Sequence, residues 1–195
     1  MTPDRSCFRR RHQGGAMLIE VLVAILLCAF GLLGFAALQS RASTAEFEAL
    51  QRSQALVLVE DMANRVSANR GNAGAYVQSA LVGDGSEQNC GGLTGAALDV
   101  CDWGNLLRGA SESSGSTAIG AMLGARGCIT RAAGSTDRYL ISVAWLGLVS
   151  TGATAAPCGQ GSTAFSDDTL RRAVSATVCV ARLRDPAVPV STLRC

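Results

Sequence analysis

The chain has 195 residues, of which 48% are hydrophobic and 16% charged, and its formal net charge is +2. This composition excludes a disordered protein, and the charge is too small for the electrostatic footprint of a nucleic-acid-binding protein. Its single histidine, His12, lies in a segment that we expect to be removed. The remaining chain would then lack the residue needed for histidine-dependent nucleophilic catalysis and the commonest zinc ligand. We therefore expect no enzymatic activity, no metal and no cofactor.

A basic N-terminal segment precedes a long apolar one. Residues 1–15 contain four arginines and one acid and end in Gly15, whereas residues 16–38 are apolar and contain Glu20 as their only charged residue. As a helix, residues 16–38 would extend about 35 Å, enough to cross a hydrocarbon core of about 30 Å. Because arginines stay on the cytoplasmic side, we expect this segment to be the transmembrane half of an N-terminal helix, with the following chain facing outward.

Two simpler interpretations of the apolar segment fit less well. A secretory signal peptide would have a shorter apolar core closed by a cleavage site of small residues, and no such site follows here. A plain uncleaved anchor does not explain Glu20, because an ionised carboxylate inside hydrocarbon costs at least a few kcal/mol. Glu20 therefore indicates a function that needs a partner of opposite charge.

The junction between the two segments carries a family resemblance. Gly15 is followed by Ala-Met-Leu-Ile-Glu, which places Glu20 fifth after the glycine. This resembles the class III signal of type IV pilins and pseudopilins. The resemblance implies that a prepilin peptidase cleaves between Gly15 and Ala16, removes the leader 1–15 and N-methylates Ala16. The family usually has phenylalanine where this chain has Ala16.

The resemblance also gives Glu20 a role in assembly. Cleavage would create a cationic amine on Ala16, one helical turn from Glu20 in the same chain. In an assembly of parallel helices, the Glu20 carboxylate can instead meet the Ala16 amine of a neighbouring subunit. Two ions that are costly alone in a low-dielectric environment then offset each other and fix the axial register.

The helix is predicted to continue beyond the membrane. Residues 39–69 contain no proline and no glycine, and we expect one helix from about residue 16 to about residue 68, with 39–69 as its amphipathic half. Asp61 and Arg65 have the i, i+4 spacing of a surface ion pair. The apolar stripe expected to pack on a sheet consists of Phe47, Leu50, Ala55, Val57, Leu58, Met62 and Val66.

This amphipathic half carries a second, more specific resemblance. Residues 50–55 read Leu-Gln-Arg-Ser-Gln-Ala, residues 60–65 read Glu-Asp-Met-Ala-Asn-Arg, and residues 68–70 read Ala-Asn-Arg. The pattern is similar to the PilV family of minor pilins, the type IV pilus modification proteins, in which R-S-Q-A precedes D-M-x-x-R and a final N-R. Weaker similarity continues at 101–103, 125–129, 143–145 and 170–174.

Residues 70–195 are predicted to form an outward-facing globular α+β domain. Residues 71–95 are rich in glycine and small polar residues and suggest a linker, and Thr94 could N-cap a short helix over 96–108. Alternating apolar residues predict three strands, which we expect in an antiparallel sheet of three or four strands, with disulfides, packed against the helix stripe. These strands are expected at 126–132, 138–146 and 170–182.

The cysteines favour an oxidising compartment. Apart from Cys7 in the leader and Cys28 in the apolar segment, six remain, an even number typical of a disulfide framework, for which fifteen pairings are possible. Cys90–Cys101 is the most plausible local pair, and Cys158–Cys179 would leave Cys128 to pair with Cys195. The spacing contains no C-x2-C motif and does not suggest a metal or redox site.

Two polar pairs near the C-terminus have alternative interpretations. Asp167-Asp168 resembles a calcium ligand pair, but the glycine-containing loop of a calcium motif is missing, which favours a solvated turn. Arg171-Arg172 opens the last predicted strand and could contact a nucleic acid or a partner pilin. We favour protection of a sheet edge for these arginines.

The sequence hypothesis is a minor pilin that is incorporated into a type IV pilus or primes its assembly, supporting pilus biogenesis, twitching motility and adhesion. The resemblance implies other minor pilins, the major pilin, the prepilin peptidase, the inner-membrane assembly platform and membrane lipid as partners, and no nucleic acid. The alternatives are a minor pseudopilin of a type II secretion system and an adhesin on a pilin stem.

Overall fold

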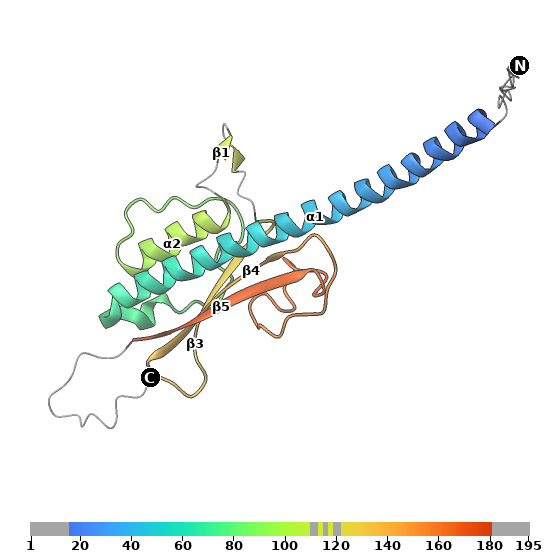
Figure 1. Cartoon of the computed structure of the whole chain (residues 1–195). Coiled ribbons are helices and arrows are strands. Elements are labelled where there is room, and N and C mark those ends of the chain that lie inside the picture. Colours follow the sequence, from blue (N-terminus) through green and yellow to red (C-terminus); the bar gives the residue numbers. More distant parts are fainter. Residues whose placement is uncertain (1–15, 110–112, 115–116, 119–121, 181–195) are drawn as a thin grey trace, which may run out of the picture. The chain divides into compact units, whose positions relative to one another are not determined.

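The computed structural model describes residues 16–109, 113–114, 117–118 and 122–180. The chain divides into two compact units, residues 1–45 and residues 46–195. The described part of the first unit is helical throughout, and the second unit contains helices and a small sheet (Figure 1). The predicted α+β class is confirmed.

The first helix, α1, spans Ala16–Ala68, as the uninterrupted absence of proline predicts. It is followed by a 3₁₀ helix, η1, at Arg70–Tyr76, which buries Ala73 and Tyr76. The expected linker over 71–95 is therefore wrong in its first part, because a turn of 3₁₀ helix places Tyr76 in the core.

The second helix, α2, spans Ala96–Leu107. Its N-cap is Gly95, with φ of 58°, and no side chain caps the helix, so the predicted cap at Thr94 is wrong. A left-handed backbone conformation at the cap favours glycine, which lacks the Cβ that would clash there. Trp103 of this helix is fully buried, and its Nε1 donates a hydrogen bond to the Leu58 carbonyl of α1 at 2.9 Å.

Three strands form the main antiparallel sheet in the order β3-β4-β5. They span Arg126–Arg131, Arg138–Leu146 and Arg171–Cys179, each end within three residues of the predicted one. A further antiparallel pair joins two-residue strands, β1 at Ser113–Ser114 and β2 at Thr117–Ala118. Val82 also forms an isolated antiparallel bridge with Gly127 of β3, so the 71–95 segment also packs against the sheet.

The main core lies between one face of this sheet and the helices. Alternation along β4 places its odd-numbered residues in this core, as expected from the sequence. The α1 stripe is shifted from the prediction, because Phe47, Leu50 and Val57 are exposed. The fully buried face of α1 has spacings of four, four, three and four residues and consists of Gln51, Ala55, Val59, Met62 and Val66.

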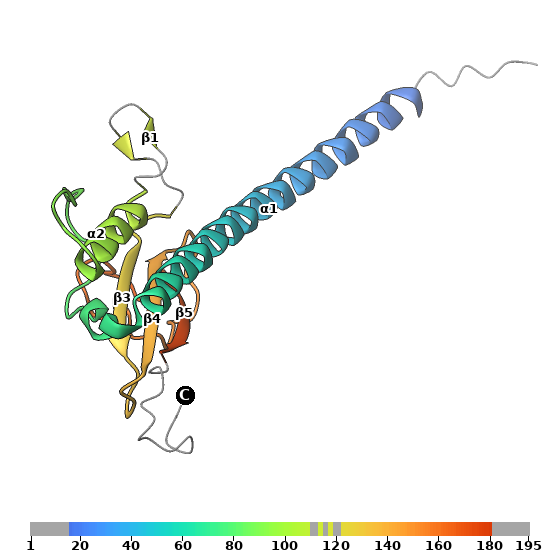
Figure 2. The same cartoon turned by 90° about the vertical axis from the view of Figure 1, so that its left-hand side faces the viewer.

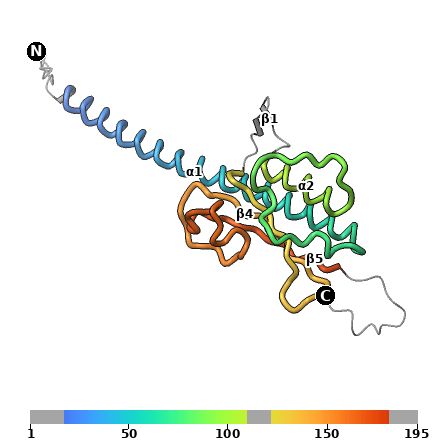
Figure 3. Tube along the Cα trace, turned by 180° about the vertical axis from the view of Figure 1, so that it is seen from behind, coloured from blue at the N-terminus to red at the C-terminus, as the bar shows by residue number. Residues whose placement is uncertain are grey.

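The opposite face of the sheet is covered by the connection between β4 and β5 (Figure 3). Phe165 and Cys158 from this connection pack with Ala144 of β4. A disulfide joins Cys158 to Cys128 of β3, and a second joins Cys90 to Cys101 of α2. The second is the local pair expected from the sequence.

The expected pairs Cys158–Cys179 and Cys128–Cys195 are wrong, because Cys158 bonds to Cys128. The strand register gives the physical reason. Cys128 lies opposite Ser142, whereas Cys179 lies opposite Arg138, four residues and about 13 Å farther along β4. Cys179 is also disulfide-bonded, and Cys195 lies outside the described residues.

Candidate assembly surface

The first unit presents an apolar surface with an acid embedded in it. The large hydrophobic side chains of residues 18–38 are each 50–71% exposed. Of the described residues, only α1 forms a helix long and apolar enough to cross a membrane, and its apolar segment is not buried. A surface this apolar is expected to be covered by lipid or by other helices.

Glu20 lies within this apolar surface. Its side chain is exposed, with Ile19 and Val21 on either side, and among the described residues no cationic group pairs with it. Ala16 is the first residue of α1 and precedes Glu20 by one helical turn, about 6 Å of rise. Gly15 and the rest of the leader, with Cys7 and His12, lie outside the described residues.

In the second unit, Arg65 is the centre of a polar cluster that joins three elements. Its Nε donates to Asp61 at 2.9 Å, the i, i+4 pair expected from the sequence, and its Nη1 donates to Asp99 of α2 at 3.0 Å. The Tyr76 hydroxyl, from η1, donates to the other Asp99 oxygen at 2.5 Å. The cluster therefore ties α1, η1 and α2 together through one shared carboxylate.

Burial and charge in this cluster shift two pKa values. Burial raises the pKa of Tyr76, and the adjacent Asp99 carboxylate raises it further by accepting its proton in a hydrogen bond. Burial opposes the charged form of Arg65, but the hydrogen bonds and charges of Asp61 and Asp99 outweigh it and raise the Arg65 pKa. Tyr76 and Asp99 are separated in sequence by 23 residues, and no local pattern linked them.

A second polar contact joins α1 to the end of the sheet. Glu48 of α1 pairs with Arg172 of β5 at 3.2 Å. The same Glu48 oxygen accepts hydrogen bonds from the backbone N–H groups of Leu148 and Val149. Arg172 therefore faces α1 and does not guard the edge of the sheet.

Arg171 has a different role from its neighbour and is fully buried. Its Nε donates to Asp168 at 2.5 Å, and its other nitrogens donate to three backbone carbonyls, those of Thr154, Ala156 and Cys158, at 2.7–3.0 Å. The favoured assignment of both arginines to edge protection is therefore wrong, because Arg171 holds the β4–β5 connection in place.

The two aspartates before β5 bond to neighbouring residues of the same chain. Asp168 pairs with Arg171, and Asp167 accepts hydrogen bonds from the backbone N–H and hydroxyl of Thr169 at 2.9 and 2.7 Å. These bonds stabilise the charged form and lower the Asp167 pKa. Among the described residues, no group of three or more potential ligands could hold a metal ion.

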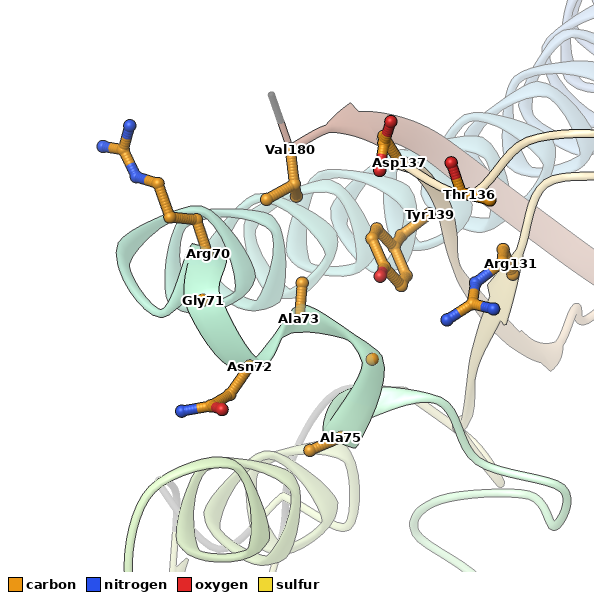
Figure 4. Close-up of a pocket in the computed structure, with 11 residues that line it drawn as sticks. Arg70, Gly71, Asn72, Ala73, Ala75, Arg131, Thr136, Asp137, Tyr139 and Val180 are labelled. Carbon is orange, nitrogen blue, oxygen red and sulfur yellow. The ribbon is translucent and has the colours of Figure 1, made fainter. Parts of the chain in front are cut away.

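A surface cavity of about 680 Å³ lies beside η1 and the β3–β4 turn (Figure 4). Arg131 lies over the Tyr139 ring, with its guanidinium carbon 5.8 Å from the ring centroid. Arg70 and Asn72 point away from Tyr139 and Arg131, so the polar groups around this cavity do not converge on a common point.

Comparison with known proteins gave a match from the middle of α1 to the start of α2. Residues 37–100 match the family model of Tt1218-like proteins, described as type IV pilin Tt1218. The match supports a relation to the type IV pilin superfamily. With the long apolar N-terminal helix, the three-stranded antiparallel sheet and the disulfides, the α+β fold is type IV pilin-like. Neither the curated proteins nor the solved structures gave a match.

Proposed function

We propose that this protein is a minor pilin, inserted in the inner membrane through residues 16–38 and then incorporated into a type IV pilus or the complex that primes it. The observation that carries the proposal is Glu20, an acid without a described partner inside an exposed apolar helical surface. The match of residues 37–100 to type IV pilins supports the same interpretation. The role is structural, and the residue pattern of the amphipathic half of the helix, which resembles the PilV family, favours a minor pilin.

In the proposed assembly, prepilin peptidase cleaves after Gly15 and methylates Ala16. The Ala16 amine of one subunit then neutralises Glu20 of the next, which removes the cost of each isolated ion in an apolar environment. The globular unit would lie in the periplasm before assembly and would contact other minor pilins and the major pilin afterwards. Pilus biogenesis, twitching motility and adhesion would depend on this incorporation.

The variant Glu20→Val tests the proposal in the native bacterium. We expect the variant to be cleaved and inserted in the membrane but to be absent from sheared pili, because an unpaired Ala16 amine cannot enter the apolar interior of the filament. Glu46→Val is the matched control, since Glu46 is an exposed acid on the same helix beyond the apolar segment. Immunoblots of membrane and sheared-pilus fractions measure both outcomes.

Normal incorporation of the Glu20→Val variant into pili would contradict the assembly role. Loss of enzyme export on deletion of the protein, with normal twitching, would instead favour a pseudopilin of a type II secretion system.

A further inference from the structure

The two edges of the three-stranded sheet differ in how their backbone groups are used. On β3, Gly127 and Val82 exchange two hydrogen bonds of 2.8 and 2.9 Å, and the Gln78 N–H donates to the Ile129 carbonyl at 3.0 Å. These outward groups of β3 therefore have partners in the segment before α2.

β5 forms the other edge of the sheet, with β4 between it and β3 (Figure 2). Its register with β4 and the hydrogen bonds at both ends, Val180 to Asp137 and Gly147 to Leu170, show that the even-numbered residues bond to β4. The odd-numbered residues then direct both N–H and C=O away from the sheet. Among the described residues, no hydrogen bond engages the outward backbone groups of Ala173, Ser175 and Thr177.

This edge also lacks the usual protection against strand pairing. Residues 173–178 read Ala-Val-Ser-Ala-Thr-Val, without charge, glycine or proline. Natural sheet edges are commonly blocked by charged side chains, proline or bulges. The adjacent arginines do not serve here, because Arg171 is buried and Arg172 pairs with Glu48. Within the described residues, this edge is therefore open to pairing with an extended chain.

A groove of about 400 Å³ lies beside the start of this edge, lined in part by Trp145, Val174 and the α1 residues Glu48 and Arg52. Glu48 is already engaged by Arg172, whereas Arg52 is exposed and has no carboxylate partner in the part of the chain described. The groove therefore offers one unneutralised guanidinium group next to the open backbone edge. Its charge is complementary to an acidic side chain.

We propose that the β5 edge binds an extended segment of a partner protein as an added strand, with an acidic side chain of that segment held by Arg52. The backbone groups of Ala173, Ser175 and Thr177 would supply the main-chain hydrogen bonds, and the groove would select the side chain. This inference does not depend on the proposed pilus function, because it rests on the sheet edge and the groove alone.

The test uses the full chain in detergent micelles and synthetic peptides as probes. The first peptide alternates valine and threonine and ends in aspartate, the second replaces the aspartate by asparagine, and the third repeats the first with N-methylated amides. We expect the first to bind and to slow amide exchange at Ser175 and Thr177 at least tenfold at saturation. The second should bind about three- to fivefold more weakly, and the third should not bind, since it cannot donate main-chain hydrogen bonds.

Substitutions distinguish the contact of Arg52 with the acidic side chain from the main-chain hydrogen bonds of β5. Arg52→Gln should abolish the preference for the aspartate peptide, while Arg138→Gln, a change at an exposed arginine of β4, should leave it unchanged. Thr177→Pro removes an outward N–H without removing a hydrogen bond to β4 and should abolish binding, whereas Thr177→Val keeps the N–H and should retain it.

Absence of peptide binding by the unaltered chain would overturn the proposal, as would equal binding of the N-methylated peptide. An aspartate preference that survives Arg52→Gln would also overturn it. The same holds if Ser175 and Thr177 are already protected in the chain alone by concentration-dependent pairing of two copies.

Discussion

Gly127 of β3 lies directly against the Trp103 ring. A Cβ at position 127 would overlap two ring carbons of Trp103, which is fully buried and held by its hydrogen bond to α1. We expect Gly127→Ala to destabilise the second unit by about 1–3 kcal/mol, because the ring or the strand must move. Gly152→Ala is the control, since no atom lies within 4 Å of its added Cβ. Thermal unfolding in detergent followed by circular dichroism measures both, and equal melting temperatures would contradict this packing.

The raised pKa of Tyr76 predicts that the folded protein loses stability at alkaline pH. Because its pKa in the folded state lies above the usual 10.0, the folded chain keeps the phenolic proton where the unfolded chain has lost it. This stabilisation is complete below pH 10 and decreases as the pH rises from about 10 through the folded-state pKa. Absorbance titration of the phenolate should show a late component that Tyr76→Phe removes. A titration of the unaltered chain without a late component would contradict the buried Tyr76–Asp99 contact.

Residues close in sequence were the easier part of the polar cluster to predict. The Asp61–Arg65 pair follows from helical spacing, whereas Asp99 and Tyr76 join it only because α2 and η1 fold against the end of α1. Arg171 illustrates the same limit. Two adjacent arginines at a strand start gave no indication that one is buried among carbonyl groups and the other pairs with α1.

At the scale of elements, the disulfide between Cys128 and Cys158 connects β3 to the β4–β5 connection. On the chain-entropy relation, closing a loop across a sequence separation of 30 stabilises the fold by about 3–4 kcal/mol. The double variant Cys128→Ser/Cys158→Ser should lose about this amount in unfolding experiments. Peptide mapping without reduction should recover residues 128 and 158 in one linked pair, and a link between 158 and 179 would contradict the strand register.

The helix and strand positions were largely predictable, because each follows a local period. An unbroken run without proline or glycine over 39–69 predicts the end of α1, and alternation predicts β4 to the residue. The rotation of α1 about its axis was not predictable. Phe47, Leu50 and Val57 satisfy a helical stripe, yet the sheet packs on the face that contains Gln51 and Val59. The choice between overlapping stripes depends on the partner surface, and exposed apolar residues on α1 remain available to other helices.

At the scale of the whole molecule, the chain combines a small disulfide-linked α+β unit with an apolar helix whose described side chains are exposed. The family match covers only residues 37–100 and does not include the leader, Glu20 or the sheet. The interpretation of those parts therefore rests on their own residues and not on that match. The assembly role rests on whether Ala16 acquires a free amine that can reach a neighbour's Glu20.

The most direct measurement is intact mass and N-terminal sequencing of the protein purified from membranes of the native bacterium. We expect a chain of 180 residues (195 minus the 15 of the leader) that begins at Ala16 and carries one additional methyl group on its amine. A chain that retains residues 1–15, or that begins at any residue after Ala16, would contradict the proposal, because the amine proposed to pair with Glu20 would not lie on Ala16.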